Sequence, residues 1–287
     1  MCVLAGGALV LTGCSNSEDN SPAVAKVSGI DKFDAAAALL PDNIKQSGTL
    51  IVGVNIPYQP NEYRDANDKI VGFDVDMMDA VAATLGLEAD YRESSFEKII
   101  PAIQAGTYAV GMSSITDSKE REQSVDFTTY FNAGSQWAQQ SGKPIDPDNA
   151  CGKRVAVQAT TVQDTDEIPA RSKKCEAEGK PAIDKKSFDE QSAATNALML
   201  GQVDAMSADS PVTAYAIKKS DGKIEAAGKV FDSAPYGWAI PKGSALGKAL
   251  QAAVQHLIDN GKYLEITKNW GVQEGAITKS VINGAAS

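Results

Sequence analysis

Hydrophobic residues alternate between strand-like and helix-like patterns along the chain from residue 48 onward. Residues 50–54 (LIVGV) form a continuous apolar run, which is typical of a parallel strand that is buried on both faces. After Gly72, apolar residues recur at helical spacing, and Gly86 marks the end of the predicted helix. The apolar positions of this helix are Val75, Met78, Ala82 and Leu85. Repeated units of this kind predict an α/β fold with parallel sheets.

The same alternation predicts the remaining elements, which fall into two series. The first series continues with a helix over residues 99–105 and a strand over 108–112, and a second series begins with a strand over 154–157. The elements predicted after it are a helix over 189–201, a strand over 203–206, a helix over 210–219, an extended segment over 236–240 and helices over 244–260 and 263–270. Two series predict two lobes.

The N-terminal segment has the features of an export signal. The first thirteen residues are mostly apolar and carry no charge, like the hydrophobic region of a secretory signal. Residues 11–14 (LTGC) resemble a bacterial lipobox, in which the cysteine is lipidated and becomes the first mature residue. We therefore expect residues 1–14 to be a signal peptide with lipidation at Cys14, and residues 15–44, which begin with a polar run, to be a flexible tether and lead-in. The lipid would hold the exported protein at the outer face of the bacterial cytoplasmic membrane.

Composition and charge exclude several classes of function. The 287 residues are 43% hydrophobic, which indicates a packed soluble protein with one large or two modest domains. A net charge of −10 argues against binding to nucleic acid and against a basic membrane-binding surface. The single histidine, His256, excludes paired-histidine zinc sites, and we expect neither a metal nor a cofactor. No stretch in the body of the chain reaches the roughly 20 apolar residues that span a bilayer.

Two cysteines remain once Cys2 of the signal and the lipidated Cys14 are set aside. These are Cys151 and Cys175, which lie 24 positions apart. In an exported protein two remaining cysteines most simply form a disulfide, and the alternative is a pair of free buried thiols. A disulfide that closes a loop of this size stabilises the fold by about 3 kcal/mol in the chain-entropy model.

Nine motifs carry a resemblance when they are taken together in order and spacing. They are residues 58–63 (YQPNEY), 72–77 (GFDVDM), 96–101 (FEKIIP), 111–121 (GMSSITDSKER), 125–128 (VDFT), 152–161 (GKRVAVQATT), 201–205 (GQVDA), 234–237 (APYG) and 269–271 (NWG). In this combination the chain resembles the family 3 extracellular solute-binding proteins, which are the amino-acid-capturing components of ABC importers. The resemblance covers about residues 48 to 271, nearly all of the mature chain.

The resemblance implies a two-lobed, periplasmic-binding-protein-like (type II) fold with a hinge of two crossings. Lobe one would comprise residues 45–133 and 239–287, and lobe two residues 134–238, with the crossings near residues 134–137 and 236–238. The ligand would lie between the lobes at the carboxyl ends of the strands. The implied function is extracytoplasmic capture of an α-amino acid and its delivery to an ABC importer permease by a monomer that is not an enzyme.

The residues themselves suit the carboxylate and ammonium groups of an α-amino acid. Arg121 can bond both carboxylate oxygens through its planar guanidinium. Thr116 offers a hydroxyl and a backbone N–H at a strand end, and Thr161 lies where a strand leads into a helix, whose N–H groups attract an anion. Asp209 can neutralise the ammonium group, and the Ser114 carbonyl can share that task. The matching positions in the family have these roles.

The predicted side-chain pocket is lined by amide and aromatic groups. It contains Asn55, Tyr58, Asn61, Phe96 and Gln158. None of these residues is charged, so we expect an amino acid with an uncharged, polar side chain. Glu62 and Arg64 are expected in a solvated loop, and the alternative for Glu62 is that it turns inward.

Two other functions remain open at the level of sequence. A dehydratase-type enzyme on the same binding fold would need a proton donor aimed at the leaving group, and the only candidate, Asp209, is committed to the ammonium. A module that reports its ligand to a receptor would use the same binding site.

Overall fold

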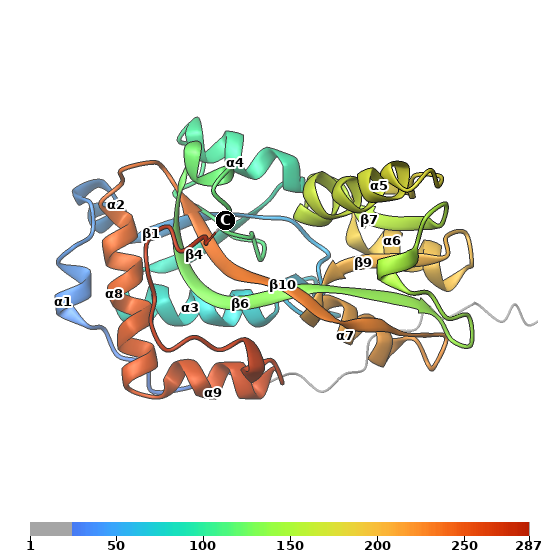
Figure 1. Cartoon of the computed structure of the whole chain (residues 1–287). Helices are drawn as coiled ribbons and strands as arrows, with labels where there is room; N and C mark the ends of the chain where they lie inside the picture. The colour runs from blue at the N-terminus through green and yellow to red at the C-terminus, as the bar shows by residue number, and fades with distance from the viewer. Residues whose placement is uncertain (1–24, 287) are drawn as a thin grey trace, which may run out of the picture.

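The computed structural model describes residues 25–286, so the predicted signal peptide and Cys14 lie outside the described residues. Within this range the chain forms an α/β fold of two lobes (Figure 1). The principal sheet has eight strands in the order β4-β1-β5-β10-β6-β9-β7-β8. The first three strands belong to lobe one and the last three to lobe two. The two central strands therefore connect the lobes.

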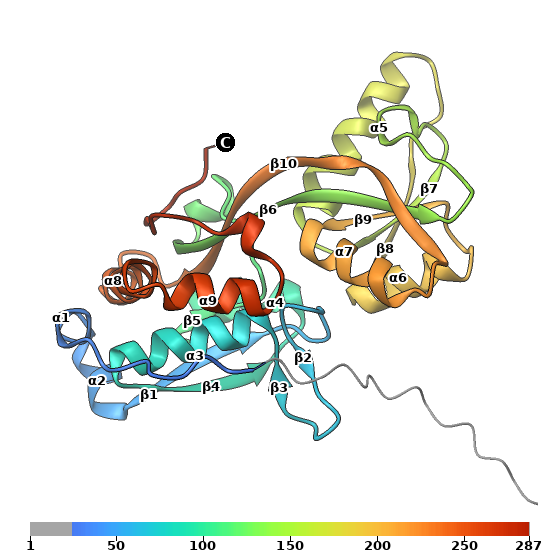
Figure 2. The same ribbon diagram turned by 90° about the horizontal axis from the view of Figure 1, so that it is seen from below.

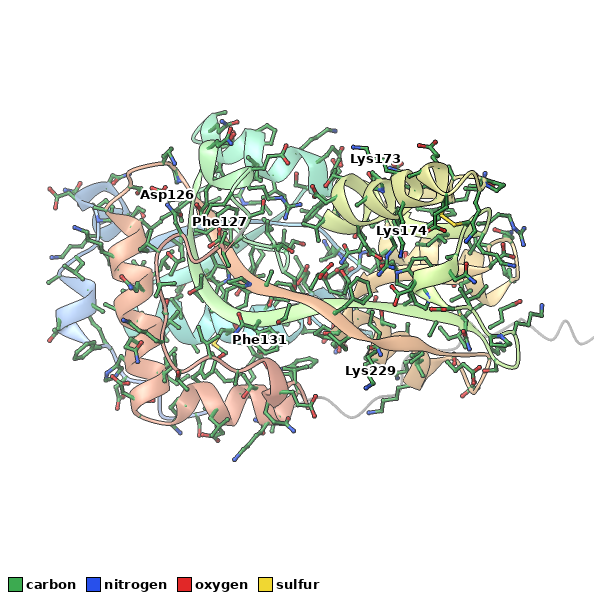
Figure 3. All side chains as sticks on the ribbon, viewed as in Figure 1. Asp126, Phe127, Phe131, Lys173, Lys174 and Lys229 are labelled. Atoms are coloured by element: carbon green, nitrogen blue, oxygen red, sulfur yellow. A yellow bond between two sulfur atoms is a disulfide. The ribbon has the colours of Figure 1, made fainter. Side chains whose placement is uncertain are left out.

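These connecting strands are β6 (Asp126–Gln140) and β10 (Ile224–Ile240), which pair in antiparallel fashion and pass from one lobe into the other (Figure 2). Phe127 and Phe131 lie on the part of β6 that belongs to lobe one (Figure 3). Three register shifts interrupt the pairing between residues 227 and 237. Such irregularities bend and twist a strand pair locally. Both crossings that the sequence predicts fall within these strands.

Lobe one surrounds the parallel strand β1 with helices. Its elements are β1 (Thr49–Val54), β2 (Tyr63–Arg64), β3 (Ile70–Val71), α3 (Phe73–Leu85), β4 (Glu88–Glu93), α4 (Phe96–Gln104), β5 (Val110–Gly111), η1 (Arg121–Gln123), α8 (Leu246–Asp259), α9 (Lys262–Asn269) and η4 (Gln273–Gly275). Strand β1 pairs in parallel with both β4 and β5. The apolar faces of α3 and α8 share one core with β1, whereas Ile99 and Ile103 of α4 pack in a separate core with Phe127.

Lobe two repeats the arrangement around the parallel strand β7. Its elements are η2 (Pro147–Asn149), β7 (Arg154–Gln158), the π-helical turn η3 (Gln163–Glu167), α5 (Ile168–Ala177), β8 (Asp184–Phe188), α6 (Gln191–Met199), β9 (Ala205–Asp209) and α7 (Ser210–Lys219). Strand β7 pairs in parallel with both β8 and β9. Cys151 and Cys175 form the predicted disulfide, which joins the segment before β7 to α5.

Several predicted boundaries differ from those in the structure. The strand expected over residues 108–112 is limited to Val110–Gly111. The helix expected from residue 99 already begins at Phe96. The strand expected over 203–206 is shifted to Ala205–Asp209. The shift has a physical reason, because β9 follows the register of its partner β6 and not the local apolar run.

Part of the expected tether is packed structure. Residues 25–44 include α1 (Asp34–Ala37), and α2 (Asp42–Ser47) follows. Ala36, Ala37 and Leu40 are buried in the core of lobe one, and the Phe33 ring stacks on His256 of α8 with centroids 4.1 Å apart. The prediction of a flexible lead-in is therefore wrong from Phe33 onward, since α8 offers this short apolar segment a surface on which to pack.

Among residues 25–286, no helix combines the length and the apolar character that a membrane span requires.

Removing the disulfide tests its predicted contribution to stability. We expect Cys151→Ala/Cys175→Ala to lower the free energy of unfolding by about 3 kcal/mol, because the unfolded chain regains the loop entropy that the bond removes. Urea unfolding measures this loss, and wild-type protein in reductant serves as the control with the same expected midpoint. An unchanged midpoint in both samples would contradict the expectation.

Candidate functional site

A small cavity of about 10 Å³ lies between the two lobes. It is lined by Asn55, Tyr58, Phe96, Ser113, Ser114, Thr116, Arg121, Gln158, Thr161, Val162, Gln163 and Asp209. The structure thus brings together all nine ligand-binding residues that the sequence predicts. The predicted set lacks Ser113, Val162 and Gln163. Serine, valine and glutamine in these contexts are equally typical of an ordinary core, so their residue types give no signal.

Arg121 is the one cation among the residues that line the cavity, and backbone carbonyls of both lobes hold it. Its Nη1 donates to the carbonyl of Thr116 at 2.9 Å, and its Nη2 donates to the carbonyl of Thr160 at 3.0 Å. The guanidinium also lies over the Phe96 ring, 5.7 Å from its centroid. These contacts fix the plane of the guanidinium at the cavity wall.

Asp209 is the one acid that lines the cavity, and three neutral donors hold its carboxylate. Its Oδ2 accepts hydrogen bonds from the hydroxyls of Tyr58 (2.8 Å) and Tyr236 (2.7 Å), and its Oδ1 accepts one from Gln163 Nε2 (2.9 Å). Burial raises the pKa of Asp209, while these hydrogen bonds and the nearby Arg121 oppose that rise. The three donors and Arg121 favour the ionised form, which is the form that neutralises an ammonium group.

Around the cavity, three side-chain hydrogen bonds of described residues join one lobe to the other. Tyr58 of lobe one donates to Asp209 of lobe two, and Gln158 Nε2 of lobe two donates to Asn55 Oδ1 of lobe one at 2.8 Å. The third is the bond from Arg121 to the carbonyl of Thr160. The lobes are therefore closed over the cavity in this structure.

Ser113 and Ser114 form the cavity wall on the side of lobe one, and buried acids hold them from behind. Ser114 has a left-handed backbone (φ 50°), and its N–H and Oγ–H both donate to Asp74 Oδ2, at 2.8 and 3.0 Å. Tyr130 donates to the same oxygen at 2.8 Å. Ser113 Oγ donates to Glu62 Oε1 at 2.6 Å. Asp74 thus stabilises a backbone conformation that is rare for serine.

Two expectations for the segment after Tyr58 are wrong. Asn61 does not line the cavity, because its side chain is buried and donates to Ser114 Oγ at 2.6 Å. Glu62 is not solvated, because its exposed fraction is 0%. The cause is Gly72 (φ 145°), where a Cβ would collide with the backbone of Asn61, so that this segment packs tightly against the start of α3. Arg64 does lie at the surface, where it pairs with Glu93 at 2.8 Å.

The carboxyl groups of Glu62 and Asp74 interact directly behind the cavity wall. Burial, together with the neighbouring Asp74, raises the pKa of Glu62 well above its usual range. Burial raises the pKa of Asp74 to about 6, although hydrogen bonds from Tyr130, Ser114 and Glu62 oppose this rise. Both buried carboxyl groups are therefore harder to ionise than they would be in water.

Comparisons with known proteins agree with this site. Residues 50–273 match the model of the bacterial extracellular solute-binding proteins, family 3. The arginine-binding protein ArgT of Corynebacterium glutamicum is 42% identical over 276 residues, which cover 95% of this chain and 91% of that protein. A solved structure of an ancestral arginine-binding protein bound to arginine has a TM-score of 0.73 and 30% identity, covering 78% of this chain and 98% of the other.

A further solved structure bears on the enzyme alternative. It is an ancestral amino acid-binding protein described as a precursor of cyclohexadienyl dehydratase, with a TM-score of 0.69 and 30% identity. It covers 81% of this chain and 99% of the other. That protein too is a binding protein.

The chain belongs to the bacterial extracellular solute-binding proteins of family 3. The family and the two-lobed type II fold that the sequence motifs predict are both confirmed.

Replacing Arg121 tests the site directly. We expect Arg121→Ala to abolish amino-acid binding while the fold survives, because the ligand carboxylate would be buried without its partner, at a cost of about 3–5 kcal/mol. Calorimetry on folded protein measures the affinity. The matched control is Arg92→Ala, which removes an exposed arginine that pairs with Asp90 at the surface and should leave the affinity unchanged. Equal affinities of the two variants would refute the assignment.

Proposed function

We propose that this protein captures a cationic amino acid, arginine above all, outside the cytoplasm and delivers it to the permease of an ABC importer. The observation that carries the proposal is the charge balance around the closed cavity. Arg121 and Asp209 line the cavity, and their opposite charges cancel. Two further acids, Glu62 and Asp74, lie behind Ser113 and Ser114, and burial raises the pKa of both.

Any ionised form of these two acids leaves net negative charge in a desolvated site. An α-amino acid with an uncharged side chain is a neutral zwitterion and would leave that charge uncompensated on closure. A ligand with a cationic side chain brings one net positive charge and restores neutrality. Since uncompensated buried charge is expensive, the closed state favours the cationic ligand.

The lining residues divide into a set for the backbone of the ligand and a set for its side chain. Arg121, Thr116 and Thr161 are placed to bind the carboxylate, and Asp209 with the Ser114 carbonyl is placed to bind the ammonium group. Asn55, Gln158 and Ser113 remain for the side chain, and they are hydrogen-bonded neighbours of one another. Their amide and hydroxyl oxygens are acceptors that suit the five N–H donors of a guanidinium.

The names of the similar proteins support the same ligand, because ArgT and the ancestral protein are both described as arginine-binding. The expected preference for an uncharged side chain depended on the absence of nearby charge, and buried Glu62 and Asp74 remove that premise.

The positions and partners of the two acids nearest the cavity favour transport over catalysis. Asp209 is the only carboxyl group among the lining residues, and three donors occupy its oxygens. Glu62 lies behind Ser113 and is separated from the cavity. Neither acid is placed to protonate a leaving group.

We also propose how the exported protein is held at the membrane. Membership of an extracellular family agrees with export, and we propose that a lipid on Cys14 holds the monomer at the membrane. The support for this part is the LTGC sequence at residues 11–14.

Calorimetry with arginine, lysine, glutamine and citrulline tests the ligand. Citrulline has the shape of arginine without its charge, so we expect arginine to bind at least ten times more tightly, a difference of about 1.4 kcal/mol. Lysine should bind with intermediate affinity, since its ammonium lacks the planar set of donors. Glutamine or citrulline as the tightest ligand would contradict the proposal.

A further inference from the structure

A second opening between the lobes lies on the other face of the hinge strands. It is a groove of about 560 Å³, whereas the cavity that Arg121 and Asp209 line has about 10 Å³. Strand β6 separates the two, because Ser135 accepts a hydrogen bond from Gln163 of the cavity wall while the next residue, Gln136, lines the groove. Helices α9 and α7 lie on the side of the groove, below the hinge strands, and α4 and α5 lie above them (Figure 1). The lobes are therefore closed over the cavity and leave an open groove behind the hinge.

The two walls of this groove differ in character. Lobe one contributes apolar surface that includes Pro60 and Trp270. Lobe two contributes α7, whose last turn carries the exposed Lys218 and Lys219. Glu274 is the one acid among the lining residues, and it belongs to the wall of lobe one. A peptide that suits both walls has an apolar part for lobe one and an acidic part for the lysines of lobe two.

The described chain begins at the rim of the same groove. The Ala25 carbonyl accepts a hydrogen bond at 3.0 Å from Asn269, which lines the groove. Lys26 pairs with Asp76 at 3.8 Å, and the same carboxylate accepts a hydrogen bond from the Trp270 indole at 2.9 Å. These contacts hold the backbone at Ala25 beside the apolar wall, so the residues that precede Ala25 start from the groove.

We propose that residues 18–24 of this chain dock in the groove and bridge the two lobes behind the hinge. Their sequence, EDNSPAV, has the two parts that the walls require. The apolar residues 22–24 come directly before Ala25 and therefore lie next to the wall of lobe one. Glu18 and Asp19 precede them and pair with the lysines at the end of α7.

The length of the segment matches the width that it has to cross. Asp19 precedes Ala25 by six positions, and six residues of extended chain span about 20 Å. Helix α7, which forms the opposite wall, has 10 residues and is therefore about 15 Å long. The two acids can consequently reach the far end of this helix.

A segment that binds both walls favours the closed arrangement of the lobes. Because β6 and β10 lie between the cavity and the groove, a rotation that opens the cavity narrows the groove. The docked segment therefore fits best when the cavity is closed. Its binding free energy adds to that of the ligand, since both bind the same state of the protein.

Fluorescence quenching of Trp270 by acrylamide reports whether the groove is occupied. The chain has three tryptophans, of which Trp137 and Trp238 are fully buried and Trp270 is partly exposed at the groove. In the wild type the docked segment should shield Trp270. We expect Glu18→Lys/Asp19→Lys to increase the quenching, because like charges then face each other across the groove and release the segment. Acrylamide is uncharged, so the substitutions do not alter its own approach.

Reversing the lysines provides the matching variant and a rescue. Lys218→Glu/Lys219→Glu should increase the quenching as well, and the combination of all four substitutions should restore the shielding, because opposite charges face each other again. The control Glu88→Lys/Glu176→Lys makes the same change of net charge at two exposed positions outside the groove. It should be quenched like the wild type.

Calorimetry with arginine measures the coupling to closure, and this readout rests on the proposed function. We expect Glu18→Lys/Asp19→Lys to bind arginine about threefold more weakly than the wild type, which is the effect of two exposed ion pairs. Equal affinities, with the shielding lost, would overturn the bridge between the lobes. A wild type that binds no arginine would refute the proposed function, and the quenching results would still decide whether the segment docks.

Two further outcomes would overturn the inference. Equal quenching in the wild type and in all charge-reversed variants would show that residues 18–24 do not cover Trp270 and would leave the groove to a partner outside this chain. Shielding that grows with the protein concentration would show that a second copy of the protein covers the groove instead.

Discussion

Asp209 is the buried charge on which both lobes and the hinge converge. Its carboxylate accepts hydrogen bonds from Tyr58 in lobe one, from Tyr236 in the hinge strand β10 and from Gln163 in lobe two. A buried carboxylate without partners would be strongly destabilising, so these three donors must be in place whenever the lobes close. Closure and the positioning of the Asp209 carboxylate, which we propose binds the ammonium group of the ligand, are consequently one event. The hydrogen bonds from Gln158 to Asn55 and from Arg121 to Thr160 strengthen the same closed arrangement.

The second constraint is the layer of buried polar groups behind Ser113 and Ser114. Asp74 lies at the start of α3, where its carboxylate also benefits from the helix dipole, and it holds Ser114 in a left-handed conformation. Glu62 reaches the same layer from the loop before β2, because Gly72 lets that loop approach α3 closely. The acids that shape the cavity wall therefore also set its charge. A change of side chain at either position affects shape and electrostatics together.

Much of the fold follows from periodicity in the sequence, and the exceptions have tertiary causes. The apolar run over residues 50–54 and the helical spacing after Gly72 predict β1 and α3 because burial on both faces of a sheet and on one face of a helix leaves a regular pattern. The nine predicted ligand-binding residues came from the family resemblance in motif order, and all nine line one cavity. Glu62 was misplaced because a glutamate in a polar segment is usually solvated, and only its contact with α3 buries it. The helix α1 was missed for a similar reason, since its burial depends on α8.

We propose that the ligand site exists only when the lobes meet, with a cationic amino acid balancing the charges between them. Small-angle scattering of the protein with and without saturating arginine tests this claim most directly. The account predicts a smaller radius of gyration with arginine, because the open state solvates Arg121 and Asp209 until a ligand replaces the water. An identical radius in both samples, with arginine binding confirmed by calorimetry in the same buffer, would contradict it.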